Sequence, residues 1–181
     1  MHDFDLDLAL RQHQALSPTD EATRRQFLAL LAADARCFWR DCFPAHFTAS
    51  AWLVSADGER ALLLHHRKLG RWLQPGGHAD GDSDLARVAL REAAEETGLV
   101  GLSVDADVFD LDAHVIPARG DEPEHWHYDL RFVVRATASE RFIANSESRD
   151  MAWRSISDIG ADLALDDSIR RMARRWLDRR C

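Results

Sequence analysis

Three glutamates, Glu92, Glu95 and Glu96, stand close together near the middle of the chain. They belong to a segment, residues 83–97, that is rich in Ala, Leu, Arg and Glu and stops at Gly98, which predicts a helix with a glycine C-cap. At about 100° per residue, the carboxylates share one side of this helix and the apolar residues share another. Because carboxylates this close repel one another, we expect a positive charge beside them.

A tight turn precedes the helix, where Pro75, Gly76 and Gly77 follow a short apolar stretch. Glycine allows backbone carbonyls to approach whatever the carboxylates hold. Carboxylate and carbonyl oxygens are the ligands that Mg²⁺ prefers, and Mg²⁺ commonly takes substrate phosphates as further ligands. The pattern therefore indicates phosphate chemistry. The alternative is a solvated acidic face on which Arg91 pairs with Glu95.

The turn and the helix together resemble the Nudix box, G-x5-E-x7-R-E-U-x-E-E-x-G-U, where U is a bulky aliphatic residue. The residues that align with the defined positions of the box are Gly77, Arg91, Glu92, Ala93, Glu95, Glu96, Gly98 and Leu99. This resemblance to the Nudix hydrolases implies an α/β fold, an α/β/α sandwich with a mixed sheet. It also implies hydrolysis of a diphosphate linkage in a nucleoside diphosphate attached to another moiety, with Mg²⁺ or Mn²⁺ as cofactor and a small-molecule diphosphate as substrate.

The resemblance assigns roles to the residues of the box. The Gly77 carbonyl and the carboxylates of Glu92, Glu95 and Glu96 would hold the metal, and Glu95 and Glu96 would also be catalytic. Arg91, counted with the catalytic residues, would anchor the carboxylates rather than touch the substrate.

A further acid is implied outside the box. In similar proteins a loop glutamate ahead of a late strand completes the metal site or acts as general base, and Glu147 is the candidate here. Glu122 and Glu124, in an earlier polar loop, are its rivals.

Two positions depart from the box. Its first glutamate falls on Ser83, and the bulky residue after Arg-Glu is Ala93. Asp80, Asp82 and Asp84 flank the gap as possible replacements, and Ser83 or Asp82 is the expected N-cap of the helix. The missing glutamate keeps a second function open, a Nudix-like module that binds a nucleotide or metabolite without cleaving it.

Two other assignments fit poorly. The D-x-D-x-D spacing that starts at Asp80 begins an EF-hand loop, but the sixth and twelfth positions hold Leu85 and Arg91 instead of Gly and Glu. Diphosphate-isoprenoid isomerases share the implied fold, but no cysteine near the box matches their catalytic one.

Bulk properties are those of an ordinary soluble globular protein. The chain has 181 residues and 46% hydrophobic content, enough for one domain with a sizeable core. Its formal charge of −8 argues against nucleic acid or an anionic membrane as partner. Three cysteines at irregular spacing, no apolar leader and no membrane-length apolar run lead us to expect a cytoplasmic protein.

The chain is expected to divide at residue 45. Residues 1–45 form a helical N-terminal extension, and residues 46–181 form the hydrolase domain. Within the extension, helices are predicted from Asp5 to about Phe43, with Ser17 or Thr19 as a cap and Pro44 as the end. This extension is expected to pack against the sheet or against a second copy in a homodimer, and substrate binding is the alternative.

The remaining elements follow from alternation and turn composition. They are strands over 47–54, 59–66, 108–118, 125–136 and 151–153, a helix starting near Ser157, and a C-terminal helix over 166–180. The first two strands and the next two are expected to form hairpins.

Basic and imidazole side chains supply the substrate-binding candidates. Arg67 belongs to a cluster of basic residues at the end of a predicted strand and could clamp phosphate oxygens. His78 follows the glycine turn directly. A solvated strand end is the alternative for Arg67.

The second predicted hairpin carries polar residues at even spacing. They are Asp112, His114, His125, His127 and Asp129. His125 and His127 could both reach one metal ion, but no third ligand is evident from sequence. The interpretation we favour is a pocket for the non-phosphate part of a substrate, with His127 as a contact.

Overall fold

The computed structural model of the chain describes residues 4–143 and 148–179. Its helices are α1 (Leu6–Gln12), α2 (Pro18–Ala33), α3 (Leu85–Thr97), α4 (Ile156–Ala161) and α5 (Asp167–Asp178). Its strands are β1 (Ala45–Val54), β2 (Arg60–His66), β3 (Trp72–Leu73), β4 (Gly76–His78), β5 (Leu102–Ile116), β6 (His125–Ala136) and β7 (Ser148–Ser155). Among the described helices, none is both long and apolar enough to cross a membrane.

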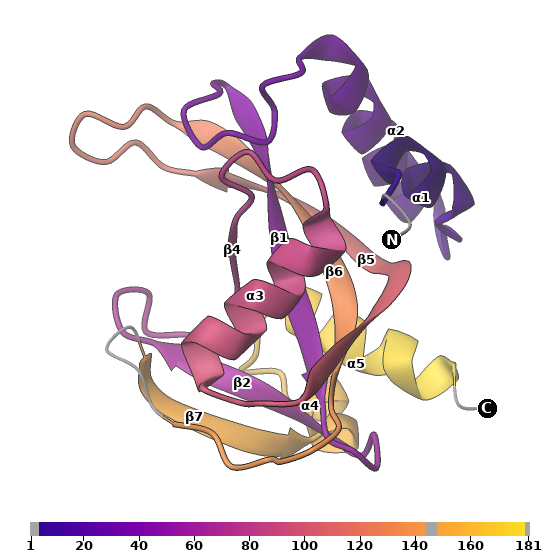
Figure 1. The fold of residues 1–181 in the computed structure, drawn as a ribbon, viewed down its shortest axis with the longest axis vertical. Helices are drawn as coiled ribbons and strands as arrows, with labels where there is room; N and C mark the ends of the chain where they lie inside the picture. Colours follow the sequence, from indigo (N-terminus) through magenta and orange to yellow (C-terminus); the bar gives the residue numbers. More distant parts are fainter. Residues whose placement is uncertain (1–3, 144–147, 180–181) are drawn as a thin grey trace.

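The strands form one mixed sheet in the order β3-β2-β1-β6-β5 (Figure 1). β1 runs parallel to β6 along its length, whereas β1 and β2 pair antiparallel, as do β5 and β6. On its other side β1 pairs with β2 at the hairpin end and with β4 nearer its start. The two predicted hairpins are therefore confirmed, and β4 enters the sheet beside β1.

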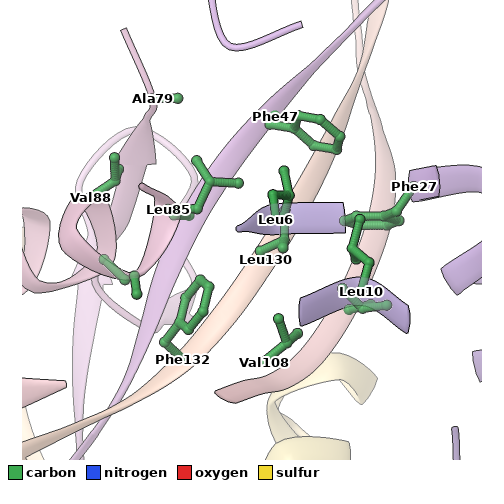
Figure 2. Packing of buried hydrophobic residues seen from close by; sticks show 14 of the residues in the cluster. Leu6, Leu10, Phe27, Phe47, Ala79, Leu85, Val88, Val108, Leu130 and Phe132 are labelled. Atoms are coloured by element: carbon green, nitrogen blue, oxygen red, sulfur yellow. The ribbon is translucent and has the colours of Figure 1, made fainter. Parts of the chain in front are cut away.

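Helices cover both faces of the sheet. On one face, Phe27 of α2 and Leu85 of α3 pack with Phe47 of β1, and α1 joins the same cluster (Figure 2). On the other face, Met172 and Trp176 of α5 pack against the sheet together with α4. The predicted α/β/α sandwich with N-terminal and C-terminal helices is confirmed.

The N-terminal helices pack against the sheet of their own chain, one of the two arrangements expected for them. Leu6 and Leu10 of α1 are buried in the same cluster as β5 and β6 residues such as Val108 and Leu130 (Figure 2). A homodimer formed through these helices stays a prediction.

Helix α2 ends earlier than predicted. Ser17 caps its start as expected, since its Oγ accepts the Asp20 N–H. The helix stops at Ala33 rather than at Pro44, because Asp34 is extended and its carboxylate accepts the Arg36 N–H in a turn.

Strand β5 begins before the predicted residue 108. It starts at Leu102 and pairs with β6 through register shifts between Val104 and Asp110. These irregularities break the alternation that the prediction relied on.

Candidate active site

Helix α3 presents the three carboxylates of the site. Its N-cap is Asp84, whose Oδ1 accepts the Arg87 N–H at 3.0 Å, and its C-cap Gly98 has φ 65°. The predicted N-caps Ser83 and Asp82 were wrong. Asp82 forms an ion pair with Arg87 at 2.6 Å and accepts the Asp84 N–H, which leaves the capping position to Asp84.

The helix has the two faces expected from its sequence. Val88, Ala89 and Ala93 are buried against the sheet. Glu92 and Glu96 are half-buried on another side, and Glu95 is exposed. The apolar face fixes the helix on the sheet, so the direction in which the carboxylates point is set by core packing.

Strand β4 brings its backbone against these carboxylates. The Gly76 N–H donates a hydrogen bond of 2.9 Å to Glu96 Oε2. A Cβ on Gly77 would lie 2.5 Å from Glu92 Oε2, so only glycine allows this approach. The glycine turn and the helix are thus in contact, as the sequence pattern predicted.

Arg91 holds this contact together from the side. Its Nη2 donates to Glu92 Oε1 at 2.8 Å and to the His78 carbonyl oxygen at 2.9 Å. The guanidinium therefore joins α3 to β4, whereas the alternative of a solvated acidic face had it paired with Glu95. Carboxylate neighbours raise the pKa of Arg91, chiefly through the hydrogen bond to Glu92, so it stays charged.

The donor set fits a hard divalent cation. Glu92 and Glu96 lie against the glycine turn, Glu95 belongs to the same helix, and all three offer carboxylate oxygens. Oxygen donors and an approachable backbone carbonyl are what Mg²⁺ and Mn²⁺ take in proteins. The residues are suited to hold such an ion.

The acids around Ser83 have other partners. Asp80 forms a bidentate ion pair with Arg40, with distances of 2.6 and 2.7 Å. Asp82 and Asp84 are occupied by an ion pair and a helix cap, as described above. Ser83 itself is exposed in the turn before α3. The structure therefore offers no ready substitute for the missing box glutamate among these three acids.

Of the predicted substrate-binding residues, His78 and His127 lie together and Arg67 lies elsewhere. The rings of His78 and His127 have centroids 5.1 Å apart. Arg67 is exposed on the turn after β2, and its Nη2 donates to the Ser148 carbonyl oxygen at 3.3 Å.

The three candidates for general base have different positions. Glu147 lies outside the described residues. Glu124 is exposed in the loop between β5 and β6. Glu122 lies in the same loop, with its Oε1 3.7 Å from His125 Nε2.

Burial keeps two histidines beside the site neutral. Desolvation, followed by the charge of Arg40, lowers the pKa of His78 to about 4. Desolvation and the surrounding histidines, His46 first among them, lower the pKa of His127 to about 2. Near pH 7 both rings can form hydrogen bonds but carry no charge for a phosphate.

Two of the polar residues predicted to line a pocket are used in the core. Asp129 accepts hydrogen bonds from Thr48 at 3.0 Å and from Ser50 at 2.9 Å, and pairs with Arg131. Asp112 also pairs with Arg131, at 3.2 Å. These carboxylates are therefore bound to neighbouring side chains.

Sequence reasoning missed His46, which lies at the start of β1. Its ring contacts those of His78 and His127, with centroids 5.3 and 4.8 Å away. Within the sequence His46 is an isolated histidine. The parallel pairing of β1 with β6 brings it to His127, and the antiparallel pairing of β1 with β4 brings it to His78.

A groove of about 710 Å³ lies between α1, α3 and β5. Its lining includes Arg87 and Leu90 of α3 but none of the three carboxylates. It is therefore separate from the site described here.

Known proteins match most of the chain. The family model described as NUDIX domain matches residues 44–177. A Mycobacterium tuberculosis protein that carries the provisional name 8-oxo-dGTP diphosphatase 3 is 35% identical over 118 residues, which cover 60% of this chain and 50% of that protein. This chain thus spans about half the length of the relative.

Solved structures share the fold. The E. coli dihydroneopterin triphosphate pyrophosphohydrolase superposes with a TM-score of 0.61 at 16% identity, covering 74% of this chain and 95% of that one. A C. elegans Ap4A hydrolase gives 0.57 at 18% identity, covering 73% and 95%. The MutT protein from Methanosarcina mazei Go1 gives 0.56 at 21% identity, covering 74% and 94%. At these identities the likeness shows the fold alone.

Proposed function

Because this chain belongs to the Nudix hydrolase family, we propose that it cleaves a diphosphate linkage in a nucleoside diphosphate joined to another moiety, with Mg²⁺ or Mn²⁺ as cofactor. The observation that carries the proposal is the contact between the carboxylates of α3 and the glycine turn of β4. It brings the carboxylates of Glu92 and Glu96 to an approachable backbone, an arrangement suited to metal-assisted phosphate chemistry.

In this proposal Glu92, Glu95, Glu96 and the Gly77 carbonyl hold the ion. When bound, a divalent cation would supply positive charge to neutralise the phosphates and would lower the pKa of a bound water molecule. The carboxylates orient the site, and the Gly76 N–H keeps the Glu96 carboxylate turned toward β4.

The other residues of the proposed mechanism position groups or move a proton. Arg91 is a positioning residue, since its hydrogen bonds hold Glu92 against the carbonyl of His78. Glu147 is proposed as general base, with Glu122 and Glu124 as rivals. His78 and His127 are proposed to contact the part of the substrate beyond the phosphates, as neutral hydrogen-bonding groups.

The substrate class is proposed from shared chemistry. The names of the similar proteins refer to 8-oxo-dGTP, Ap4A and dihydroneopterin triphosphate, and each of these compounds contains a diphosphate linkage. The fold does not choose between them.

A substrate panel tests the proposal. Purified protein is incubated with nucleoside triphosphates, 8-oxo-dGTP, dinucleoside polyphosphates, ADP-ribose and sugar nucleotides, with Mg²⁺, with Mn²⁺ and with chelator. We expect metal-dependent release of nucleotide products from at least one compound. Glu96→Gln should lower kcat by about 100-fold or more with the melting temperature unchanged.

Glu59→Gln is the matched control, because Glu59 is exposed in the turn between β1 and β2. It should keep full activity. A Glu96→Gln variant with near-normal turnover would rule out the assigned site.

A binding module without catalysis is the second candidate. Ser83, exposed where the box has its first glutamate, is the observation that favours it. Silence across the panel, together with a rise in melting temperature on addition of one compound, would support this candidate over a hydrolase.

A further inference from the structure

Three histidines meet where strands β1 and β6 begin. His46 and His127 are register partners in the parallel β1–β6 pair, and His125 lies two residues before His127, so both point to the same face of β6. One ring nitrogen from each of the three lies within 4.8 Å of the others. Spacing along β6 brings two of the rings together, and strand pairing adds the third.

Hydrogen bonds determine which nitrogen faces the cluster in two of the rings. His46 Nδ1 lies 3.2 Å from the Cys42 carbonyl oxygen, and His125 Nδ1 lies 2.8 Å from the Pro123 carbonyl oxygen. A carbonyl oxygen only accepts, so in each neutral ring Nδ1 carries the hydrogen and Nε2 carries the lone pair. Metal-binding histidines are oriented in the same way, by donating their other N–H to a carbonyl.

The Nε2 atoms are placed as ligands would be. His46 Nε2 is buried and has no hydrogen-bond partner among the described residues. His125 Nε2 and His127 Nε2 are 3.2 Å apart. Two nitrogens bound at zinc distances in a tetrahedron are about 3.3 Å apart. The His125–His127 pair therefore has the spacing of two ligands on one metal ion, and His46 adds a buried lone pair without a hydrogen-bond partner in the described part of the chain.

We propose that His46, His125 and His127 bind a divalent transition-metal ion, Zn²⁺ in the first place, at a site separate from the carboxylates of α3. Nitrogen donors suit Zn²⁺, whereas Mg²⁺ and Ca²⁺ take oxygen. Three protein ligands leave one tetrahedral position for water or another ligand. Glu122, half-exposed and 3.7 Å from His125 Nε2, is the carboxylate that stands beside it.

The competing explanation needs no metal. His127 could turn its Nε2–H toward His125 Nε2 and form an ordinary hydrogen bond, with the stacked rings serving only the packing. In that case His46 Nε2 still has no hydrogen-bond partner among the described residues. Metal binding distinguishes the two explanations directly.

The test uses the full chain, stripped of metal by chelator, in a variant with Glu92, Glu95 and Glu96 all changed to Gln. These changes remove the carboxylates that would bind metal on α3, and we call this protein the silent variant. Zn²⁺ is titrated by calorimetry, and Co²⁺ is titrated with visible absorption as the readout. We expect one Zn²⁺ per chain and the intense Co²⁺ bands of four-coordinate geometry. Absence of Zn²⁺ binding in this variant would overturn the proposal.

Replacement of one ligand locates the site. His127→Gln, made in the same silent background, should weaken Zn²⁺ binding by about 100-fold or more. His66→Gln, at the half-exposed end of β2, is the matched control and should bind like its parent. Equal affinity in the His127 and His66 variants would show that Zn²⁺ binds elsewhere.

A second measurement needs no substitution of the three histidines. Saturating Zn²⁺ should raise the melting temperature of the silent variant by mass action, and Mg²⁺ at the same concentration should not. No rise with Zn²⁺ would contradict the site. Because neither readout uses hydrolysis, the inference stands or falls independently of the proposed function.

Discussion

At the scale of single residues, Gly77 is a position where an added Cβ would meet a carboxylate of the site. A side chain there would collide with Glu92, since a Cβ would lie 2.5 Å from its Oε2. We expect Gly77→Ala to displace the Glu92 carboxylate and to lower kcat/KM for the substrate found in the panel by about 10- to 100-fold, with little change in melting temperature. Steady-state kinetics at saturating Mg²⁺ measure the effect.

Gly160→Ala is the control for this substitution. Gly160 lies in α4, and the nearest atom to an added Cβ is 3.8 Å away, in Ala173. The change should leave kinetics untouched. If Gly77→Ala also proved silent, close approach of the β4 backbone would have no part in the reaction.

Ser83 offers a test of the gap in the box. Its side chain is exposed in the turn before α3, and the neighbouring acids Asp80, Asp82 and Asp84 are already paired or capping. An added carboxylate has room there, so we expect Ser83→Glu to tighten Mg²⁺ binding by about tenfold and to raise the rate at limiting Mg²⁺. Activity measured across a Mg²⁺ titration decides this. A fall in rate would mean that the loop is arranged around serine.

The residues of the α3 site could be predicted, whereas the histidine cluster could be predicted only in part. Helical periodicity alone places Glu92, Glu95 and Glu96 on one side, because neighbouring turns are fixed by local geometry. His46 reaches His127 through a parallel strand pair, and that pairing leaves no trace in local spacing.

At the scale of elements, Asp20 of α2 forms an ion pair that connects the N-terminal helices to α5. This carboxylate, at the start of α2, accepts hydrogen bonds from the Leu16 N–H at 2.9 Å and from Arg175 Nη1 at 3.1 Å, and its Oδ1 lies 3.4 Å from His13 Nε2. Burial raises the pKa of Asp20, but these hydrogen bonds outweigh it and hold the pKa well below its usual range.

Asp20→Asn should therefore lower the free energy of unfolding, by about 2 kcal/mol at pH 7. Because the folded-state pKa is depressed, this contribution is present above the unfolded pKa near 4 and is lost as pH falls below it. Urea unfolding at pH 7 and at pH 3 should show a smaller difference between variant and wild type at pH 3. Asp7→Asn removes an exposed pair with Arg11 and should change little. A difference independent of pH would contradict the role given to Asp20.

Strands with aliphatic residues and clear turns at their ends were predicted from the sequence. Strand β4 and the end of α2 depend on contacts that the local sequence does not reveal, and they were not predicted. β1, β2 and β6 follow from aliphatic residues and a polar turn. β4 is only Gly76–His78, without β-forming residues, and becomes a strand because β1 lies beside it. The end of α2 depended on the Asp34 turn, which competes with the helix for the backbone.

At the scale of the whole molecule, ion pairs of two arginines with the buried Asp110 join α5 to the sheet. Arg131 of β6 pairs with Asp129 at 2.9 Å and with Asp110 at 3.2 Å. Arg171 of α5 binds the same Asp110 at 2.8 Å and so ties the helix to the sheet. Burial lowers the pKa of Arg131. The surrounding aspartates, Asp112 first, raise it by more, so the pKa lies above its ordinary value and the guanidinium stays charged.

Removing Arg131 would leave buried carboxylates without their partner, which costs more than the pair itself contributes. We expect Arg131→Met to lower the free energy of unfolding by about 3–5 kcal/mol, measured by urea unfolding at pH 7. Arg36→Met, which removes an exposed pair with Asp41, should cost less than about 1 kcal/mol. Equal stability of the two variants would mean that Arg171 and Arg175, which also lie beside Asp110, neutralise the carboxylates of the sheet without Arg131.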